Sequence, residues 1–106
     1  MAFAPLLLGL VAYPLLEEWV FRGVLLREAD ERWPKWRGWR TNLAVSLLFG
    51  AAHIPAWPLV HAGAVVFPSL VLGGVWQRYR RLWMCVALHC GANACAYLSP
   101  LAVDWF

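Results

Sequence analysis

The stretch that decides the fold is Ala2–Leu26, AFAPLLLGLVAYPLLEEWVFRGVLL, an apolar run that carries three charged residues in its second half. At about 1.5 Å of rise per residue, a helix of this length crosses a hydrocarbon core of about 30 Å. Each charge near mid-membrane costs about 2.5 to 3.5 kcal/mol, so Glu17, Glu18 and Arg22 offset much of what the leucines contribute. Ionisable residues retained in such a segment indicate a functional site.

The composition of the whole chain also favours a membrane protein. Of its 106 residues, 62% are hydrophobic and 14% are charged. Soluble domains have roughly 25% charged residues, and so short a chain could not bury this much apolar surface in a soluble core. The three cysteines match no CxxC pattern and are expected to be small buried residues. Because the basic residues beyond the first segment lie in two short connections, no nucleic-acid partner is expected.

Three further apolar segments follow the first. They cover about residues 41–56, 59–76 and 82–103. Pro55 and Pro58 should end the second segment, and Pro68 with the Gly73-Gly74 pair should interrupt the third. The predicted fold is an all-α, polytopic transmembrane bundle of about four spanning helices, with residues 1–106 forming a single intramembrane domain in a lipid bilayer.

The distribution of Lys and Arg predicts the orientation of this bundle. Five lie in residues 27–40 and three in 78–81, whereas 54–60 has none. Both basic loops should therefore be cytoplasmic, in a bacterial inner membrane, with both termini on the far side. A start on the far side without basic flanking residues is unusual and predicts either an unusual mode of insertion or further spans upstream of this sequence. Seven of the eight tryptophans, all except Trp19, lie where an interfacial aromatic belt is expected.

The charged residues of the first segment divide by helix geometry. Glu17 and Glu18 lie about 100° apart around a helix, so they cannot point the same way. Glu18 and Arg22 are four residues apart and can neutralise each other, which leaves Glu17 facing other helices as a candidate general base. Two alternatives remain: the group is a helix-packing ion network, or Arg22 extends to the cytoplasmic face.

Other polar residues fall at a similar depth on different segments. His89 and Asn93, four apart, could donate to an oxyanion, serve a metal, or join helices by hydrogen bonds. His53 could line a site or cap its helix. Helical rise, counted from the predicted cytoplasmic boundaries, puts four of these polar residues about 10 to 18 Å deep, in one shared layer. That layer contains Glu17, His53, His89 and Asn93. His61 lies about 25 Å deep, near the opposite interface beside Trp57.

Three motifs occur in order along the chain. Glu17-Glu18-Trp-Val-Phe-Arg22 matches EExxxR, Phe49-Gly-Ala-Ala-His53 matches FxxxH, and His89-Cys-Gly-Ala-Asn93 matches HxxxN. Together they resemble the CPBP family of intramembrane proteases, relatives of the type II CAAX prenyl endopeptidase, over about residues 15–94. Members usually have further spans before EExxxR. Short members resemble bacterial proteases associated with C-terminal sorting signals.

The resemblance implies a glutamate-type endopeptidase that hydrolyses a peptide bond in a membrane-anchored or lipidated protein. By the same resemblance, Glu17 and His53 activate a water, His89 and Asn93 stabilise the tetrahedral oxyanion, and the site is supported by Glu18 and Arg22. No cofactor is expected in this interpretation.

Three alternatives remain open from the sequence. In a zinc-dependent version of the protease, the metal ligands would be Glu17, His53 and His89. A second alternative is a non-catalytic membrane scaffold or bacteriocin-immunity protein with the same fold. A third is an ion or proton pathway lined by the same residues.

Overall fold

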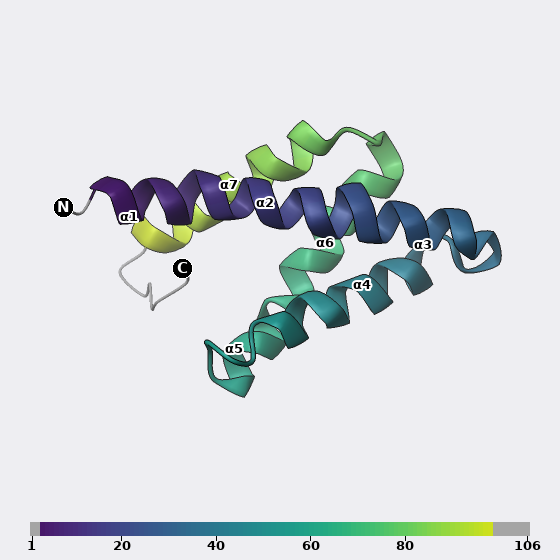
Figure 1. The fold of residues 1–106 in the computed structure, drawn as a ribbon, viewed down its shortest axis with the longest axis horizontal. Helices are drawn as coiled ribbons and strands as arrows, with labels where there is room; N and C mark the ends of the chain where they lie inside the picture. The colour runs from purple at the N-terminus through teal and green to yellow at the C-terminus, as the bar shows by residue number, and fades with distance from the viewer. Residues whose placement is uncertain (1–2, 99–106) are drawn as a thin grey trace.

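The described part of the chain, residues 3–98 of a computed structural model, folds into four helical rods and contains no strand (Figure 1). The first rod consists of α1 (Phe3–Leu7), η1 (Leu8–Ala12), α2 (Tyr13–Glu18), η2 (Trp19–Leu26) and α3 (Arg27–Arg32). The others are α4 (Trp39–Ala52), α5 with α6 (Leu59–Ala64 and Val66–Tyr79), and α7 (Leu82–Leu98), and a short turn, η3 (Pro34–Trp36), precedes α4. The predicted all-α class is confirmed.

The first rod organises the others. In Figure 1 it runs along the long axis of the molecule, with α7 beside its N-terminal part and α4 beside its C-terminal part. Both η1 and η2 are π-helical, a widened form that is rare and often found at functional sites. Glu17 and Glu18 end α2, directly before η2, so the charged motif lies at the start of a π-helical segment.

The sequence prediction that a charged loop begins at Arg27 is wrong. The rod continues through α3 because this segment contains good helix formers and a Glu28–Arg32 ion pair of 3.5 Å one turn apart. The helix ends at Arg32, since Pro34 disfavours a helical backbone at the residue before it. Asp30 on this extension is almost fully buried, so α3 belongs to the packed body of the molecule.

The third rod is interrupted at Val65, between α5 and α6, and not at the glycine pair as predicted. Pro68 lies in the first turn of α6, where its missing N–H leaves no helical hydrogen bond unmade. Within residues 3–98, Leu59–Tyr79 is the one helix long and apolar enough to cross a membrane, with a mean hydropathy of 1.7. α7 is apolar but shorter. The number of spans therefore stays a prediction.

α4 and α6 approach each other closely because glycines replace side chains at their contact. A Cβ atom on Gly73 would lie 1.8 Å from Oδ1 of Asn42. On Gly50, it would lie 2.8 Å from the carbonyl oxygen of Ala62 in α5. Small residues at such positions let polar side chains of one helix reach the backbone of the next, as in membrane helix pairs.

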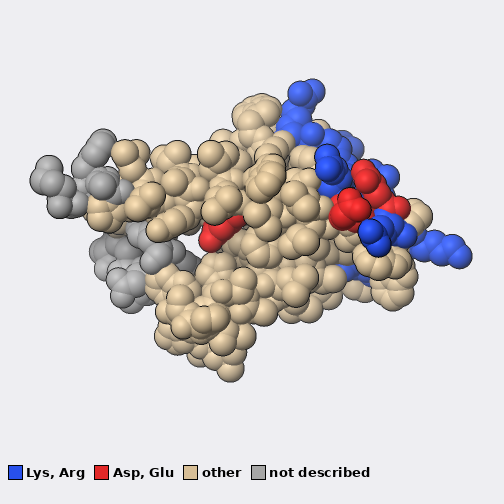
Figure 2. Space-filling model, in the orientation of Figure 1, with Lys and Arg blue, Asp and Glu red and all other residues tan. Residues whose placement is uncertain are grey.

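The basic residues gather at one end of the molecule (Figure 2). There the buried Asp30 joins three rods: it accepts a hydrogen bond of 2.5 Å from Oγ1 of Thr41, two of 3.3 Å from Gln77, and lies 3.6 Å from Arg80. The two basic segments that the sequence places on one side of the membrane therefore lie at one end of the fold.

Burial corrects two expectations about single residues. Trp76, predicted at an interface, is 8% exposed and packs in the core with Leu26, Val45 and Cys85. Of the cysteines, only Cys85 is buried, whereas Cys90 is half-buried and Cys95 is exposed. Trp33, Trp36, Trp39 and Trp83 are exposed, as an interfacial belt requires, and Trp105 lies outside the described residues.

Candidate active site

Four side chains predicted for the site line one cavity of about 840 Å³. They come from all the rods except α5–α6, which contributes apolar walls and Ser69. The four are Glu17, His53, His89 and Asn93. The rest of the lining is largely apolar, including Tyr13, Phe21, Phe67, Leu72 and Leu88. The predicted depth layer thus corresponds to a shared cavity.

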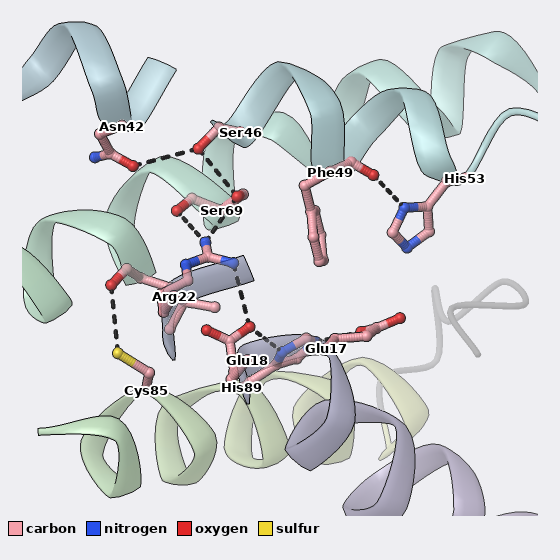
Figure 3. Close-up of polar contacts among 11 residues, drawn as sticks. Glu17, Glu18, Arg22, Asn42, Ser46, Phe49, His53, Ser69, Cys85 and His89 are labelled. Carbon is pink, nitrogen blue, oxygen red and sulfur yellow. Dashed lines mark hydrogen bonds and ion pairs between the residues drawn. The ribbon is translucent and has the colours of Figure 1, made fainter. Parts of the chain in front are cut away.

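The adjacent carboxylates point into different surroundings, as helix geometry predicts. The side chain of Glu17 is 33% exposed and its Oε1 lies 3.5 Å from Nε2 of His89. Glu18 is fully buried, and its Oε2 lies 2.7 Å from Nδ1 of the same ring (Figure 3). One imidazole therefore bridges the two acids, with Glu17 on the cavity side.

The contact with Glu18 orients the His89 ring. A carboxylate oxygen accepts hydrogen bonds, so Nδ1 of His89 is the donor when Glu18 is ionised. This leaves Nε2, which faces Glu17, as the nitrogen available to the cavity. A buried acid that fixes the ring orientation of a histidine in this way is a recurring feature of hydrolytic sites.

Arg22 is buried behind Glu18. Its Nη1 lies 3.4 Å from Oε2 of Glu18, and its Nη2 donates to both the backbone oxygen and the hydroxyl of Ser69. The guanidinium also lies 5.4 Å from the centroid of the Phe49 ring. Because Arg22 is 0% exposed, the alternative in which it extends to the membrane surface is wrong. The ion-network alternative describes Glu18 and Arg22; Glu17 meets this network through its 3.5 Å contact with His89 and also lines the cavity.

A chain of hydrogen bonds that was not predicted from the sequence continues from Arg22 into α4. The hydroxyl of Ser69 donates to Ser46 at 3.0 Å, Ser46 donates to Oδ1 of Asn42 at 3.4 Å, and Nδ2 of Asn42 donates to the Leu70 carbonyl at 2.8 Å. All three side chains are buried. The four-residue spacing of Asn42 and Ser46 was the available sequence signal, since it places both on one face of a helix.

His53 follows the last residue of α4. Its Nδ1 lies 2.6 Å from the backbone oxygen of Phe49, which can only accept, so Nδ1 carries the proton and Nε2 is the free nitrogen. The Phe49 ring also packs against His53, with centroids 4.8 Å apart. The ring thus satisfies a carbonyl of the last helical turn and also lines the cavity. A capping position and a position at the cavity are therefore compatible for this residue.

Asn93 joins α7 to the first rod. Its Nδ2 donates to the carbonyl oxygen of Gly9 in η1 at 3.1 Å. A carboxamide has two N–H donors, so this bond uses one and holds the group at the cavity wall. His61 does not line the cavity; it stacks on Trp57, with ring centroids 4.4 Å apart, as its predicted depth suggests.

The zinc alternative can be compared with this geometry. Two imidazoles and a carboxylate are donor types that suit zinc. Among residues 3–98, however, no three His, Cys, Asp or Glu side chains are gathered closely enough to hold a metal ion. Glu17, His53 and His89 as arranged do not fit a zinc ion.

Comparison with protein-family models assigns most of the chain to a family. The family model described as type II CAAX prenyl endopeptidase Rce1-like matches residues 1–95, which include all three motifs. No curated protein and no solved structure matches the chain.

Proposed function

Because this chain belongs to the type II CAAX prenyl endopeptidase Rce1-like family, we propose that it is an intramembrane endopeptidase that uses a water activated by Glu17 and His53. Its substrate is a membrane-anchored or lipidated protein. The observation that carries this proposal is the separation of two neighbouring acids: Glu18 is held by Arg22 and His89, whereas Glu17 faces an apolar cavity shared with His53.

The charges of the site support a division of roles. Glu17, Glu18 and Arg22 sum to a formal charge of −1, and a second proton on His89 would bring the buried group to zero. The imidazolium would be stabilised by Glu18, and its Nε2–H would point towards Glu17 and the cavity. It is then a donor for a developing oxyanion, together with the second N–H of Asn93.

The proposed reaction follows from these positions. A water beside Glu17 gives a proton to the carboxylate while the free Nε2 of His53 accepts a hydrogen bond from it. The water oxygen bonds to the carbonyl carbon of the substrate, and the resulting oxyanion is held by His89 and Asn93. As the C–N bond breaks, Glu17 returns its proton to the leaving amine, so that one water is consumed for each bond cut.

We also propose that the rods cross the membrane with the basic end in the cytoplasm of a bacterium. The gathering of both basic segments at one end of the fold supports this orientation. α4 has 14 residues and a length of about 21 Å, less than a hydrocarbon core of about 30 Å. A helix that starts at the cytoplasmic interface and ends so early places His53 inside the membrane.

The test of catalysis is cleavage of lipidated or membrane-spanning peptides by the reconstituted protein, followed by mass spectrometry. Glu17→Gln keeps the size of the side chain and removes its basicity, so we expect cleavage to fall by about 10² to 10⁴-fold, and Glu17→Ala should behave alike. Cleavage by Glu17→Gln at the wild-type rate would exclude the proposal.

Water activation without a metal is the second part of the proposal. It is supported by the geometry of residues 3–98, in which no three His, Cys, Asp or Glu side chains are placed to hold a metal ion together. Cleavage should therefore survive thorough chelation, and the purified protein should contain no stoichiometric zinc. Loss of cleavage on chelation, restored by added zinc, would favour the metal-dependent alternative instead.

A further inference from the structure

The buried ion pair of the site does not hold itself in place. Arg22 and Glu18 meet through a single contact of 3.4 Å, not through the paired contacts that a guanidinium and a carboxylate make when they lock together. Within the described residues, Nε of Arg22 and Oε1 of Glu18 are buried without a hydrogen-bond partner. The position of the guanidinium must therefore be set by something other than Glu18.

Ser69 supplies the missing constraint. Nη2 of Arg22 donates to the Ser69 backbone oxygen and to its hydroxyl, at 2.7 Å for the hydroxyl. Ser69 is itself fully buried on α6, across from the first rod. Two acceptors on one residue determine both the location and the tilt of the guanidinium, as Figure 3 shows.

The direction of the Ser69 hydroxyl is determined in turn. A hydroxyl has one hydrogen, and that of Ser69 is donated to Ser46, at 3.0 Å. The lone pairs of the Ser69 oxygen are thereby left for Arg22. Ser46 donates onward to Asn42, which is anchored to the backbone of α6, so the line of hydrogen bonds begins and ends on rigid helices.

We propose that Ser69 is a positioning residue for the proteolytic reaction: it holds Arg22 so that Glu18 keeps Nδ1 of His89 protonated and Nε2 directed at the cavity. This inference rests on the proposed function for its effect on rate. Its structural part, the orientation of His89, concerns the resting protein and can be measured without a substrate.

The kinetic test compares Ser69→Ala with the wild type on a cleaved peptide. Ser69 borders the cavity, but it is 0% exposed and its hydroxyl is engaged by Arg22 and Ser46, so it should orient the reacting residues without binding substrate. We therefore expect kcat to fall by about 10- to 100-fold with KM changed less than about twofold. Ser69→Thr, which keeps a hydroxyl, should recover most of the rate. Thr41→Val is the matched control: it removes a buried hydroxyl at the basic end of the fold and should leave kcat near the wild-type value.

The second test reads the tautomer of His89 by ¹⁵N NMR of histidine-labelled protein at alkaline pH, with His89→Gln to assign the signals. The wild type should show the Nδ1–H form, Ser69→Ala a mixture of both forms, and Thr41→Val the wild-type spectrum. A wild-type tautomer in Ser69→Ala, or an equal loss of rate in Thr41→Val, would overturn the proposal. If the wild type cleaves nothing, the proposed function fails, while this spectrum still decides the role of Ser69.

Discussion

At the scale of single residues, the neighbours Glu17 and Glu18 have different surroundings. Glu17 lines the cavity, whereas Glu18 is buried against Arg22 and His89. Their division follows from the sequence, because adjacent residues on a helix face different ways and Arg22 lies one turn beyond Glu18. Ser69 does not follow from it. A serine in an apolar helix is usually unremarkable, and the sequence separation of 47 positions between Arg22 and Ser69 leaves no local pattern to detect.

Removing the charge of either glutamate should therefore have different consequences. Glu18→Gln leaves the fully buried Arg22 without its counter-charge, which we expect to destabilise the protein by about 3 to 5 kcal/mol. Glu17→Gln alters a partly exposed side chain and should change stability by less than about 1 kcal/mol. Thermal unfolding in detergent measures both, and equal midpoints for the two variants would contradict the assigned roles.

At the scale of helices, the four apolar segments predict the rods but not the way the rods meet. The Gly73-Gly74 pair reads as a helix break in the sequence, yet α6 continues through it, and Gly73 provides the close approach to α4. The charged segment after Leu26 reads as a loop and is the last part of the first rod. The two errors have different causes: residues 27–32 are good helix formers that continue the rod, whereas at Gly73 packing against α4 overrides a weak local propensity.

The two glycines form a matched pair for testing the α4–α6 contact. Gly73→Ala places a Cβ atom 1.8 Å from Oδ1 of Asn42 and must displace that side chain, which we expect to cost about 1 to 3 kcal/mol. Gly74→Ala meets nothing within 4 Å and should be neutral or stabilising by up to about 1 kcal/mol. Unfolding midpoints should separate the variants; a Gly73→Ala protein as stable as Gly74→Ala would argue against the packing described here.

At the scale of the whole molecule, one end is basic and the remainder is largely apolar (Figure 2). Hydropathy locates the apolar segments but does not tell which of their side chains face inward, since lipid and protein interior are similarly apolar. Trp76 and Trp83 show this limit: the sequence treats them alike, and the structure buries the first and exposes the second. Four polar residues of the predicted spans indicated the interior better than hydropathy did, because all four line one cavity. They are Glu17, His53, His89 and Asn93.

The predicted orientation can be tested through Lys35, the only lysine in the chain, which lies at the basic end. A membrane-impermeant amine reagent should modify Lys35 in inside-out vesicles and not in right-side-out vesicles, because the proposed orientation puts the basic end in the cytoplasm. Peptide mapping identifies the modified residue, and Lys35→Arg is the control. Modification from the outer side alone would invert the topology.

For the proposed intramembrane hydrolysis, the early end of α4 also bears on how water reaches the site. Residues 53–58 leave the helix at the depth of the cavity, and they are largely exposed. In the proposed orientation, irregular backbone at such a depth is tolerated only within protein or beside a water-filled cavity. His53, Ala56 and Trp57 of this turn line the cavity, so we expect water there. In the proposed mechanism, the break that brings His53 to the cavity would thus also admit the water that each round of cleavage consumes.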